Sequence, residues 1–420
     1  MLLTAVIAIN LFIDPFGTYR IFAVGSVNAQ KSAVYQRVRL VKAYDVRRLR
    51  PRAIVLGTSR SHVGLRPSHA GWDPAARPVY NLAFDGATTK EMYYYLLHAH
   101  AVQPLRQVVL GLDTYHATTA PATTRPDFDP SLLESGRGPV LPSLVRADLK
   151  ILTSLDTLRS SLTTVESRSA REPDWFAPDG QRLGEVFFRR RGERFEEIGP
   201  RGYFEEIDRL EVGFKLEGKR AANARVPSRL EQQPASSDET SLDYIRRIVA
   251  FCRADDIDLR IFISPEHAHQ LEISAAVGEW ATIENAKRAL VALLADDAAH
   301  HPNAAPIPLW DFSGYSSITT ESLPGPGSHS EMRFYWDSSH FKDIVGDFIL
   351  DRLFGVADPQ RAVPADFGVR LTANSIETAL AHVRDDQLAY RSRNPAGVMW
   401  IRSLVDGGGP DSAHASAAMR

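Results

Sequence analysis

Short apolar runs alternate with longer amphipathic segments in two stretches of this chain. The apolar runs are Ala53–Leu56, Val79–Phe84 and Gln107–Leu112 in the first stretch, and Leu259–Ile263 and Ile307–Phe312 in the second. Runs of four to six residues with few polar interruptions are typical of strands that are buried on both faces. The pattern therefore predicts five buried strands.

Helices are predicted between and after these strands. Thr88 or Thr89 is a suitable cap for a helix through His100, because Glu91 falls in its first turn. Further segments with helical periodicity are residues 239–253, Ile283–Leu294 and Phe341–Phe354, the last of which we expect to be the final helix. Strands separated by helices predict an α/β fold, a three-layer arrangement of a parallel sheet with helices on both faces.

The pattern loosens between the two stretches. Residues 117–237 begin with a Thr/Pro-rich segment and contain a predicted helix over Leu141–Thr164. We therefore expect one α/β domain formed by residues 45–116 and 238–356, with 117–237 as a large, mostly helical insertion or subdomain. Residues 357–420 form a C-terminal extension whose tail, from Gly407, has a composition typical of disorder.

The N-terminal run Met1–Ile13 is apolar except for Thr4 and Asn10. It is shorter than the roughly 20 residues of a spanning helix. We interpret residues 1–20 as a membrane anchor or a signal-anchor remnant, which predicts an inner-membrane-anchored protein with a periplasmic or otherwise extracytoplasmic body. The alternative is a buried N-terminal strand or helix in a cytosolic, lipase-like hydrolase.

Composition narrows the function classes. The chain of 420 residues is 44% hydrophobic and 24% charged, with a net charge of −2. These values are ordinary for a globular protein and predict no general electrostatic binding of nucleic acid. The single cysteine, Cys252, excludes an intramolecular disulfide and a multi-cysteine zinc site. We expect neither a metal nor a cofactor.

Polar residues follow the first three predicted strands, in Gly57–Ser61, Asp85-Gly86 and Asp113–His116. Functional residues of parallel sheets gather in such loops, at the carboxyl ends of strands. A Gly-x-Ser turn after a buried strand presents the Ser59 hydroxyl at this edge. Because a serine hydroxyl needs a positioned base, we look for a histidine that a carboxylate orients.

The spacing Asp-x-x-His occurs four times, at Asp113–His116, Asp297–His300, Asp337–His340 and Asp411–His414. Only Asp337–His340 lies in a Gly/Ser-rich loop directly before a strongly amphipathic helix. We therefore predict Ser59 as nucleophile, His340 as base and Asp337 as the residue that orients it. The alternative is that these are ordinary capping and turn residues.

These residues resemble a known family. Gly57-Thr58-Ser59, Gly86, Gly111-Leu112-Asp113 and Asp337-x-x-His340, in this order, resemble the blocks of the SGNH/GDSL hydrolase-like superfamily. The chain most resembles its membrane-anchored, extracytoplasmic branch, which includes alginate O-acetyltransferase-like proteins. The resemblance implies the triad above, an oxyanion hole formed by the amides of Ser59 and Gly86, and a polytopic membrane acyltransferase as partner.

The chain departs from the family at the third block, where an asparagine is usual and Asp113 stands. An ionised carboxylate cannot donate a hydrogen bond to an oxyanion. Either Asp113 is protonated, or it pairs with Arg60, or another donor replaces it, or turnover is weak or lost. Arg60 is a candidate for contacting the oxyanion or a sugar carboxylate, and the alternative is an ion pair with Asp113 or Asp85.

Aromatic and histidine side chains complete the candidates. Trp336, beside the Asp337–His340 pair, and His267, in a loop after a strand, are predicted to line a substrate site. The less favoured candidates are His62, His116 and His269, while Trp310 is expected in the core.

The function predicted is transfer or hydrolysis of an O-acyl group, foremost acetyl, on a cell-envelope or secreted polysaccharide or acyl-sugar, through an acyl-serine. The alternative, from another class, is a catalytically inactive saccharide-binding or scaffold protein of the same fold. The sequence does not choose between transfer and hydrolysis, since both use the same triad.

Overall fold

The computed structural model describes residues 1–22, 24–25, 27–28, 31, 33–133, 140–166, 175–190, 193–224 and 239–407. A six-stranded sheet lies at its centre, in the order β2-β1-β3-β4-β5-β6. The first five strands are parallel, and β6 is antiparallel to β5. The prediction of an α/β fold with a mostly parallel sheet is confirmed. The strands are β1 Ala53–Leu56, β2 Val79–Asn81, β3 Gln107–Leu112, β4 Asp258–Ile263, β5 Leu309–Asp311 and β6 Val369–Leu371.

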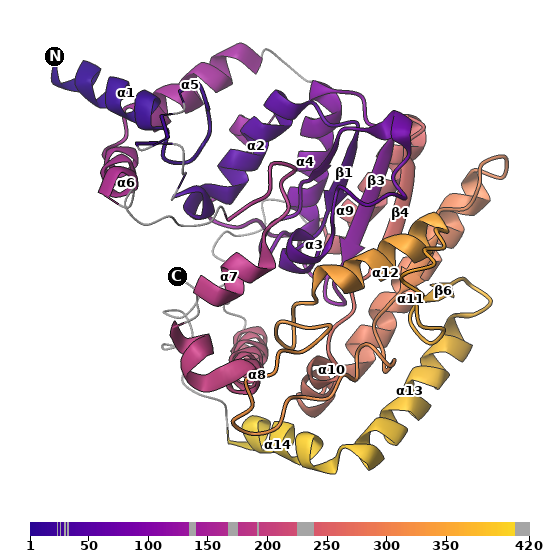
Figure 1. Cartoon of the computed structure of the whole chain (residues 1–420). Helices are drawn as coiled ribbons and strands as arrows, with labels where there is room; N and C mark the ends of the chain where they lie inside the picture. Colours follow the sequence, from indigo (N-terminus) through magenta and orange to yellow (C-terminus); the bar gives the residue numbers. More distant parts are fainter. Residues whose placement is uncertain are drawn as a thin grey trace.

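Helices cover both faces of the sheet (Figure 1). In β1, Ile54 and Leu56 join one hydrophobic cluster while Ala53 and Val55 join another, because successive side chains of a strand point to opposite faces. The first cluster includes residues of α2 (Val38–Leu49), α4 (Thr89–Val102), α9 (Ser241–Ala254), α11 (Trp280–His300) and α13 (Ile376–Arg393). The second includes residues of α12 (Asp343–Phe354).

The short helix α3 (Ser59–Gly64) packs very closely against α12. A Cβ atom added at Gly346 would lie 1.7 Å from the carbonyl oxygen of Gly64, and one added at Gly64 would lie 2.0 Å from the ring of Phe341. The backbones can approach this closely only because both positions are glycine. The two elements that begin beside Ser59 and His340 are thereby held against each other.

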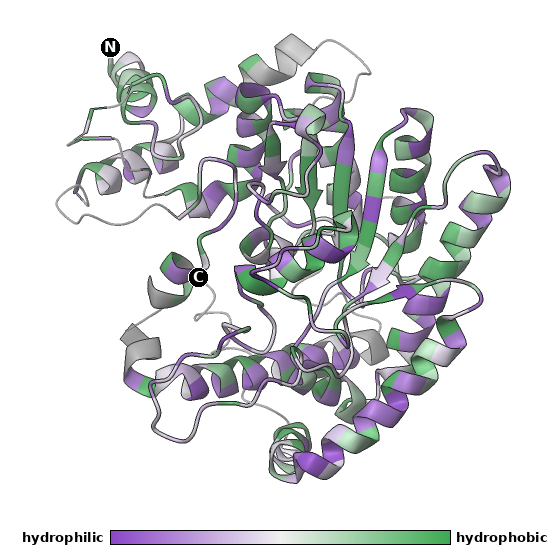
Figure 2. Cartoon of the chain, turned by 45° about the vertical axis from the view of Figure 1, so that its right-hand side comes forward, coloured by the Kyte–Doolittle hydropathy of each residue, from purple (hydrophilic) through white to green (hydrophobic). Residues whose placement is uncertain are grey.

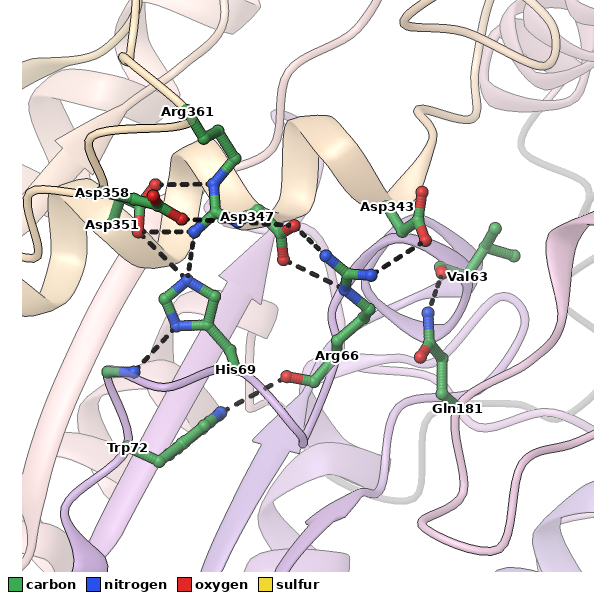
Figure 3. A network of polar contacts seen from close by, with 11 residues as sticks. Val63, Arg66, His69, Trp72, Gln181, Asp343, Asp347, Asp351, Asp358 and Arg361 are labelled. Carbon is green, nitrogen blue, oxygen red and sulfur yellow. Dashed lines mark hydrogen bonds and ion pairs between the residues drawn. The ribbon is translucent and has the colours of Figure 1, made fainter.

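A network of charged groups strengthens this packing (Figure 3). Arg66, which follows α3, pairs with Asp347 of α12. His69 contacts Asp351 at 3.1 Å, and Arg361 contacts the same carboxylate at 2.9 Å. The segment after α3 is therefore tied to α12 at two successive turns of that helix.

Several predicted boundaries change. The single helix predicted over Leu141–Thr164 is two helices, α5 (Val140–Leu152) and α6 (Leu155–Glu166). The break falls at Ser154, whose hydroxyl accepts hydrogen bonds from the amides of Asp156 and Thr157 and so caps α6. The strand predicted over Val79–Phe84 is shorter, since β2 ends at Asn81.

The prediction that α12 is the final helix is wrong. Strand β6 and helices α13 and α14 (Pro395–Asp406) follow it. Their apolar residues pack at the edge of the sheet and against α10 (Ala268–Ala276) rather than along one continuous stripe, which is why the sequence pattern there is weak. The tail predicted to be disordered lies, from residue 408 on, outside the described residues, as do Asp411 and His414.

The remaining helices lie in the N-terminal segment and in residues 117–237, the segment predicted as an insertion. Helix α1 (Leu2–Ile13) packs on α5 and α6, and Asn10 donates hydrogen bonds to the carbonyl oxygens of Leu152 and Ser154 at the turn between them. Among the described helices, none combines the length and apolarity that a membrane span requires. The insertion also contains α7 (Gly184–Arg190) and the long α8 (Glu193–Ala224), and 3-10 turns lie at Val34–Arg37, Pro74–Ala76 and Pro130–Leu132.

Candidate active site

Ser59 is the first residue of α3, directly after the turn that ends β1. The Ser61 hydroxyl lies between two glycines, Gly57 and Gly111, and neither position has room for a side chain. A Cβ atom added at Gly57 would lie 2.3 Å from the Ser61 hydroxyl oxygen, and one added at Gly111 of β3 would lie 2.2 Å from it. The two glycines of the first and third sequence blocks therefore make room for α3 at the carboxyl edge of the sheet, between β1 and β3.

The structure brings the three predicted catalytic side chains together. The Nε2 atom of His340 lies 2.9 Å from the Oγ atom of Ser59. On the other side of the ring, Nδ1 lies 3.0 Å from both carboxylate oxygens of Asp337. Asp337 is buried, whereas Ser59 and His340 are partly exposed. A hydroxyl, an imidazole and a buried carboxylate thus form one continuous hydrogen-bonded line that opens to solvent at the serine.

The local backbone fixes the Asp337–His340 pair. One carboxylate oxygen of Asp337 accepts hydrogen bonds from the amides of Ser339 and His340, each at 2.8 Å. The amide of Trp336 donates to the carbonyl oxygen of His340 at 2.9 Å, which closes the turn. The spacing of three residues therefore works as the sequence predicts, because a tight turn places the carboxylate beneath the imidazole.

Arg60, the neighbour of Ser59, is buried among protein acceptors. Its guanidinium lies 2.9 Å from Asp113 and 2.8 Å from Glu266. Its Nε and Nη2 groups also donate to the carbonyl oxygen and hydroxyl of Ser339, at 2.9 and 2.8 Å. The interpretation of Arg60 as an ion-pair partner of Asp113 is confirmed. Arg60 links the ends of β1, β3 and β4 to the turn that carries His340.

Asp113 is ionised in this setting. Burial opposes ionisation, but the Arg60 guanidinium and nearby donors lower its pKa to about 2. The hydroxyls of Thr58 and Tyr115 both donate to it at 2.8 Å. Of the alternatives given for Asp113, the prediction that it is protonated is wrong, and the prediction that it pairs with Arg60 is confirmed. A carboxylate so arranged accepts hydrogen bonds and has none to donate to an oxyanion.

His267 has a structural environment. Its Nδ1 atom accepts from the amide of His269, and Nε2 donates to the carbonyl oxygen of Glu321 at 2.8 Å. Burial, together with the neighbouring His269, lowers its pKa to about 3. His267, predicted to line a substrate site, is the N-terminal cap of α10. The ring is a neutral, buried cap whose two nitrogens are both engaged.

Trp336 and Gly86 are held by neighbours from the insertion. Trp336 stacks on Phe188 of α7, with ring centroids 5.1 Å apart, and the Lys342 ammonium lies 4.3 Å from its ring centroid. Gly86 has φ near +59°, and Arg125 donates to its carbonyl oxygen at 3.1 Å. Phe188 also lies 5.6 Å from the His340 ring, so α7 forms one wall beside the base.

The three other candidate histidines, His62, His116 and His269, are buried, each with a polar partner. His116 accepts from the amide of Asp113 and donates to the carbonyl oxygen of Ala87. His269 contacts Asp208 of α8 at 2.7 Å. His62 lies 3.4 Å from Asp85, and its pKa is lowered to about 3, mainly by burial. Trp310 packs against the second hydrophobic cluster, as expected of a core residue.

Sequence reasoning named Asp113 as a partner of Arg60 but missed other groups of the site. Glu266 and Ser339 stand within segments that the sequence singled out, but their roles depend on long-range pairing. Tyr115 lies within the Asp113–His116 segment, but nothing in the sequence marks it as a hydrogen-bond donor to Asp113. Asp208 gives no local signal. No local pattern in the sequence marks these partners, because the burial of Arg60 is set by the fold.

Within the described ranges, no group of three or more histidine, cysteine, aspartate or glutamate residues has the arrangement of a metal site. Comparison of the chain with protein-family models, curated proteins and solved structures finds no match. The functional argument therefore depends on the geometry of the site itself.

Proposed function

We propose that this protein transfers or hydrolyses an O-acyl group through an acyl-serine on Ser59. The observation that carries the proposal is the distance of 2.9 Å between Ser59 Oγ and His340 Nε2, with Asp337 bound to the opposite ring nitrogen. A carboxylate on Nδ1 selects the tautomer that carries its proton there, so that Nε2 presents a lone pair to the serine hydroxyl.

The chemistry follows from this arrangement. As the Ser59 oxygen attacks the carbonyl carbon of an ester, its proton moves to His340 Nε2, and the carbonyl π electrons move to the oxygen. When the tetrahedral intermediate collapses, the ester C–O bond breaks and the leaving alcohol takes the proton from His340. Water or a sugar hydroxyl then attacks the acyl-serine by the same steps and releases Ser59.

We propose that backbone amides donate the hydrogen bonds that stabilise the oxyanion. Asp113 is ionised, and Arg60 is directed at Asp113, Glu266 and Ser339. Neither is arranged as an oxyanion donor. The amides of Ser59 and Gly86 are therefore the proposed pair, in keeping with the family resemblance.

The arrangement of the sheet supports the SGNH-like assignment as a proposal. Strands β2-β1-β3-β4-β5 are parallel, and Ser59 and Asp113 follow β1 and β3, on the two sides of the point where the strand order reverses. The resemblance adds a polysaccharide or acyl-sugar as substrate, acetyl as the acyl group, and a polytopic acyltransferase as partner.

A second candidate function is a catalytically silent saccharide-binding protein. The observation that favours it is the ionised Asp113 at a position where the family has a donating asparagine. This candidate predicts an intact fold without acyl turnover.

A fluorophosphonate serine probe and an acetyl-ester reporter distinguish these functions. We expect the wild type to be labelled and to release acetate, while Ser59→Ala does neither. Ser61→Ala, which removes a buried hydroxyl two residues away, is the matched control and should be labelled. An unlabelled but folded wild type would favour the silent binder, and equal turnover by wild type and Ser59→Ala would remove Ser59 from the mechanism.

A further inference from the structure

We propose that Arg39 is a positioning residue of the oxyanion hole, where it aims the amide N–H of Gly86 at the developing oxyanion. The inference rests on the proposed function, since it assigns a role in the chemistry at Ser59. Arg39 lies in α2, outside every sequence block of the site. Its Nη2 group donates a hydrogen bond to the carbonyl oxygen of Asp85 at 3.3 Å.

The carbonyl oxygen of Asp85 and the amide of Gly86 belong to the same trans peptide group. A trans peptide group is planar, and its C=O and N–H bonds point in opposite directions. Gly86 has φ near +59° and no side chain that restricts the rotation of this plane. A donor that holds the Asp85 carbonyl oxygen therefore fixes the direction in which the Gly86 N–H points.

Arg39 is itself held in one orientation. Helices of this protein carry both hydrophilic and hydrophobic residues, and the polar residues of such helices normally face solvent (Figure 2). Arg39 departs from this pattern, because it is only 8% exposed. Its guanidinium group lies 3.0 Å from Glu91, 3.2 Å from Asp127 and 4.7 Å from the ring centroid of Phe84. Two ion pairs and an aromatic ring thus define the position of the donor.

A second arginine holds the next peptide group through the same carboxylate. Glu91 is fully buried and also accepts a hydrogen bond from the amide of Arg125 at 2.8 Å. The Arg125 side chain donates in turn to the carbonyl oxygen of Gly86 at 3.1 Å. The peptide groups on both sides of Gly86 are thus each bound by a guanidinium group. An oxyanion hole stabilises charge best when its donors are in place before the reaction, and this arrangement provides that order.

The charge of Arg39 also makes the Gly86 amide a stronger donor. A cation at the carbonyl oxygen polarises the peptide group, and hydrogen bonds in such a chain strengthen one another. The effect matters here because the ionised Asp113 has no proton to donate, which leaves the amides of Ser59 and Gly86 as the proposed donors. Since the oxyanion develops only on the way to the transition state, loss of the Gly86 orientation should lower the rate rather than weaken substrate binding.

Kinetics of Arg39→Lys on the acetyl-ester reporter test the proposal. The lysine ammonium can still pair with Glu91, but it lacks the fork of a guanidinium that holds the Asp85 carbonyl at the same time. We expect kcat to fall by about 10- to 100-fold with little change in KM. A boronic acid inhibitor should bind more weakly by the same factor, because its boron accepts the Ser59 oxygen, the proton moves to His340, and the product is a tetrahedral anion.

The matched control is Arg253→Lys, the same replacement at a side chain that is 16% exposed and pairs with Asp297 at 2.7 Å. Arg253 lies at the end of α9, shortly before β4 begins, and so at the opposite edge of the sheet from Ser59. This control should lose stability without a change in kcat or in boronic acid affinity. Equal effects of the two substitutions on kcat would overturn the positioning role.

Asp127→Asn is a milder second variant for the case that Arg39→Lys does not fold. It removes one anchor of Arg39 at a carboxylate that is 39% exposed, and leaves Glu91 paired. We expect kcat to fall in the same sense, by about 3- to 10-fold. An unchanged kcat in this folded variant and in folded Arg39→Lys would contradict the inference.

Nuclear magnetic resonance measures the Gly86 amide independently of turnover. Labelling with carbonyl-¹³C aspartate and ¹⁵N glycine selects the Asp-Gly pairs of the chain, which are Asp85-Gly86, Asp179-Gly180 and Asp406-Gly407. The Gly86 amide proton should move upfield in Arg39→Lys, while that of Gly407 stays in place. An unmoved Gly86 resonance would overturn the inference whether or not the protein cleaves esters. A wild type that neither cleaves esters nor binds the boronic acid, in a protein that shows the Gly86 shift, would contradict the proposed function while supporting the fixed orientation of the amide.

Discussion

At the scale of single residues, one buried arginine organises the candidate site. Arg60 joins Asp113, Glu266 and the Ser339 turn, while the residue directly before it in the chain is the proposed nucleophile. Its planar guanidinium offers several donors in fixed directions, which suits four acceptors on three elements. We infer that Arg60 is a positioning residue, which acts by holding Ser59 and His340 in register rather than by contacting substrate.

We expect Arg60→Lys to lower kcat by about 10- to 100-fold with a smaller change in KM, because a small displacement of the nucleophile from its base is costly. A lysine ammonium cannot reach all four acceptors at once. Steady-state kinetics on the acetyl-ester reporter measure the effect. The control is Arg288→Lys, the same replacement at a surface ion pair with Glu377. An unchanged kcat in folded Arg60→Lys would contradict the positioning role.

At the scale of elements, the contact between α3 and α12 determines the site. The two helices begin beside Ser59 and His340, and the crossing at Gly64 and Gly346 leaves no room for a side chain. The separation of the two helices therefore sets the distance between Ser59 and His340. Neither Gly64 nor Gly346 has a side chain that could take part in the chemistry.

Gly346→Ala should reduce the free energy of unfolding by about 3 kcal/mol, since the new methyl group would meet the backbone oxygen of Gly64 and force the helices apart. Denaturant unfolding measures this change, and acyl turnover should fall with it. Gly218→Ala in α8 is the matched control. It has open space around it and should gain up to about 1 kcal/mol from helix propensity. Equal effects of the two substitutions would show that the crossing is not tightly packed.

At the scale of the whole molecule, buried neutral histidines couple stability to pH. Burial, reinforced by Lys42 near His62 and by His269 near His267, lowers both pKa values to about 3. In the unfolded chain the same groups titrate near pH 6.5. Between pH 3 and 6.5 the unfolded state therefore binds more protons, and stability is full above pH 6.5 and is lost as the pH falls.

Each of these two histidines should contribute a slope of about 1.4 kcal/mol per pH unit in that range. We expect His62→Gln to flatten the pH dependence of the unfolding free energy between pH 6 and 4 by about this amount. Denaturant titrations at each pH measure it. His300→Gln, at a side chain that is 70% exposed, should leave the slope unchanged. If His62→Gln keeps the wild-type slope, His62 is not the buried neutral group described here.

Much of the architecture could be predicted from the sequence because its signals are local. Ala53–Leu56 and Gln107–Leu112 are strands with the predicted boundaries, since a run buried on both faces is apolar without alternation. The Thr88–Glu91 capping box and the Asp337–His340 turn were likewise predictable, because each closes within four residues. Ser59 directly follows a predicted strand and His340 lies in a loop directly before a predicted helix, so both were candidates for the same edge of a parallel sheet.

Long-range pairing decided the rest. The sequence leaves open whether Asp113 is protonated or paired, and only the folded chain places it beside Arg60, where a cation stabilises its charge. His267 looks like a site residue in the sequence and becomes a buried cap once Ser338 and Glu321 surround it. Burial and partners separated by hundreds of residues set the charge and accessibility of a side chain, and these quantities exist only after the elements have packed.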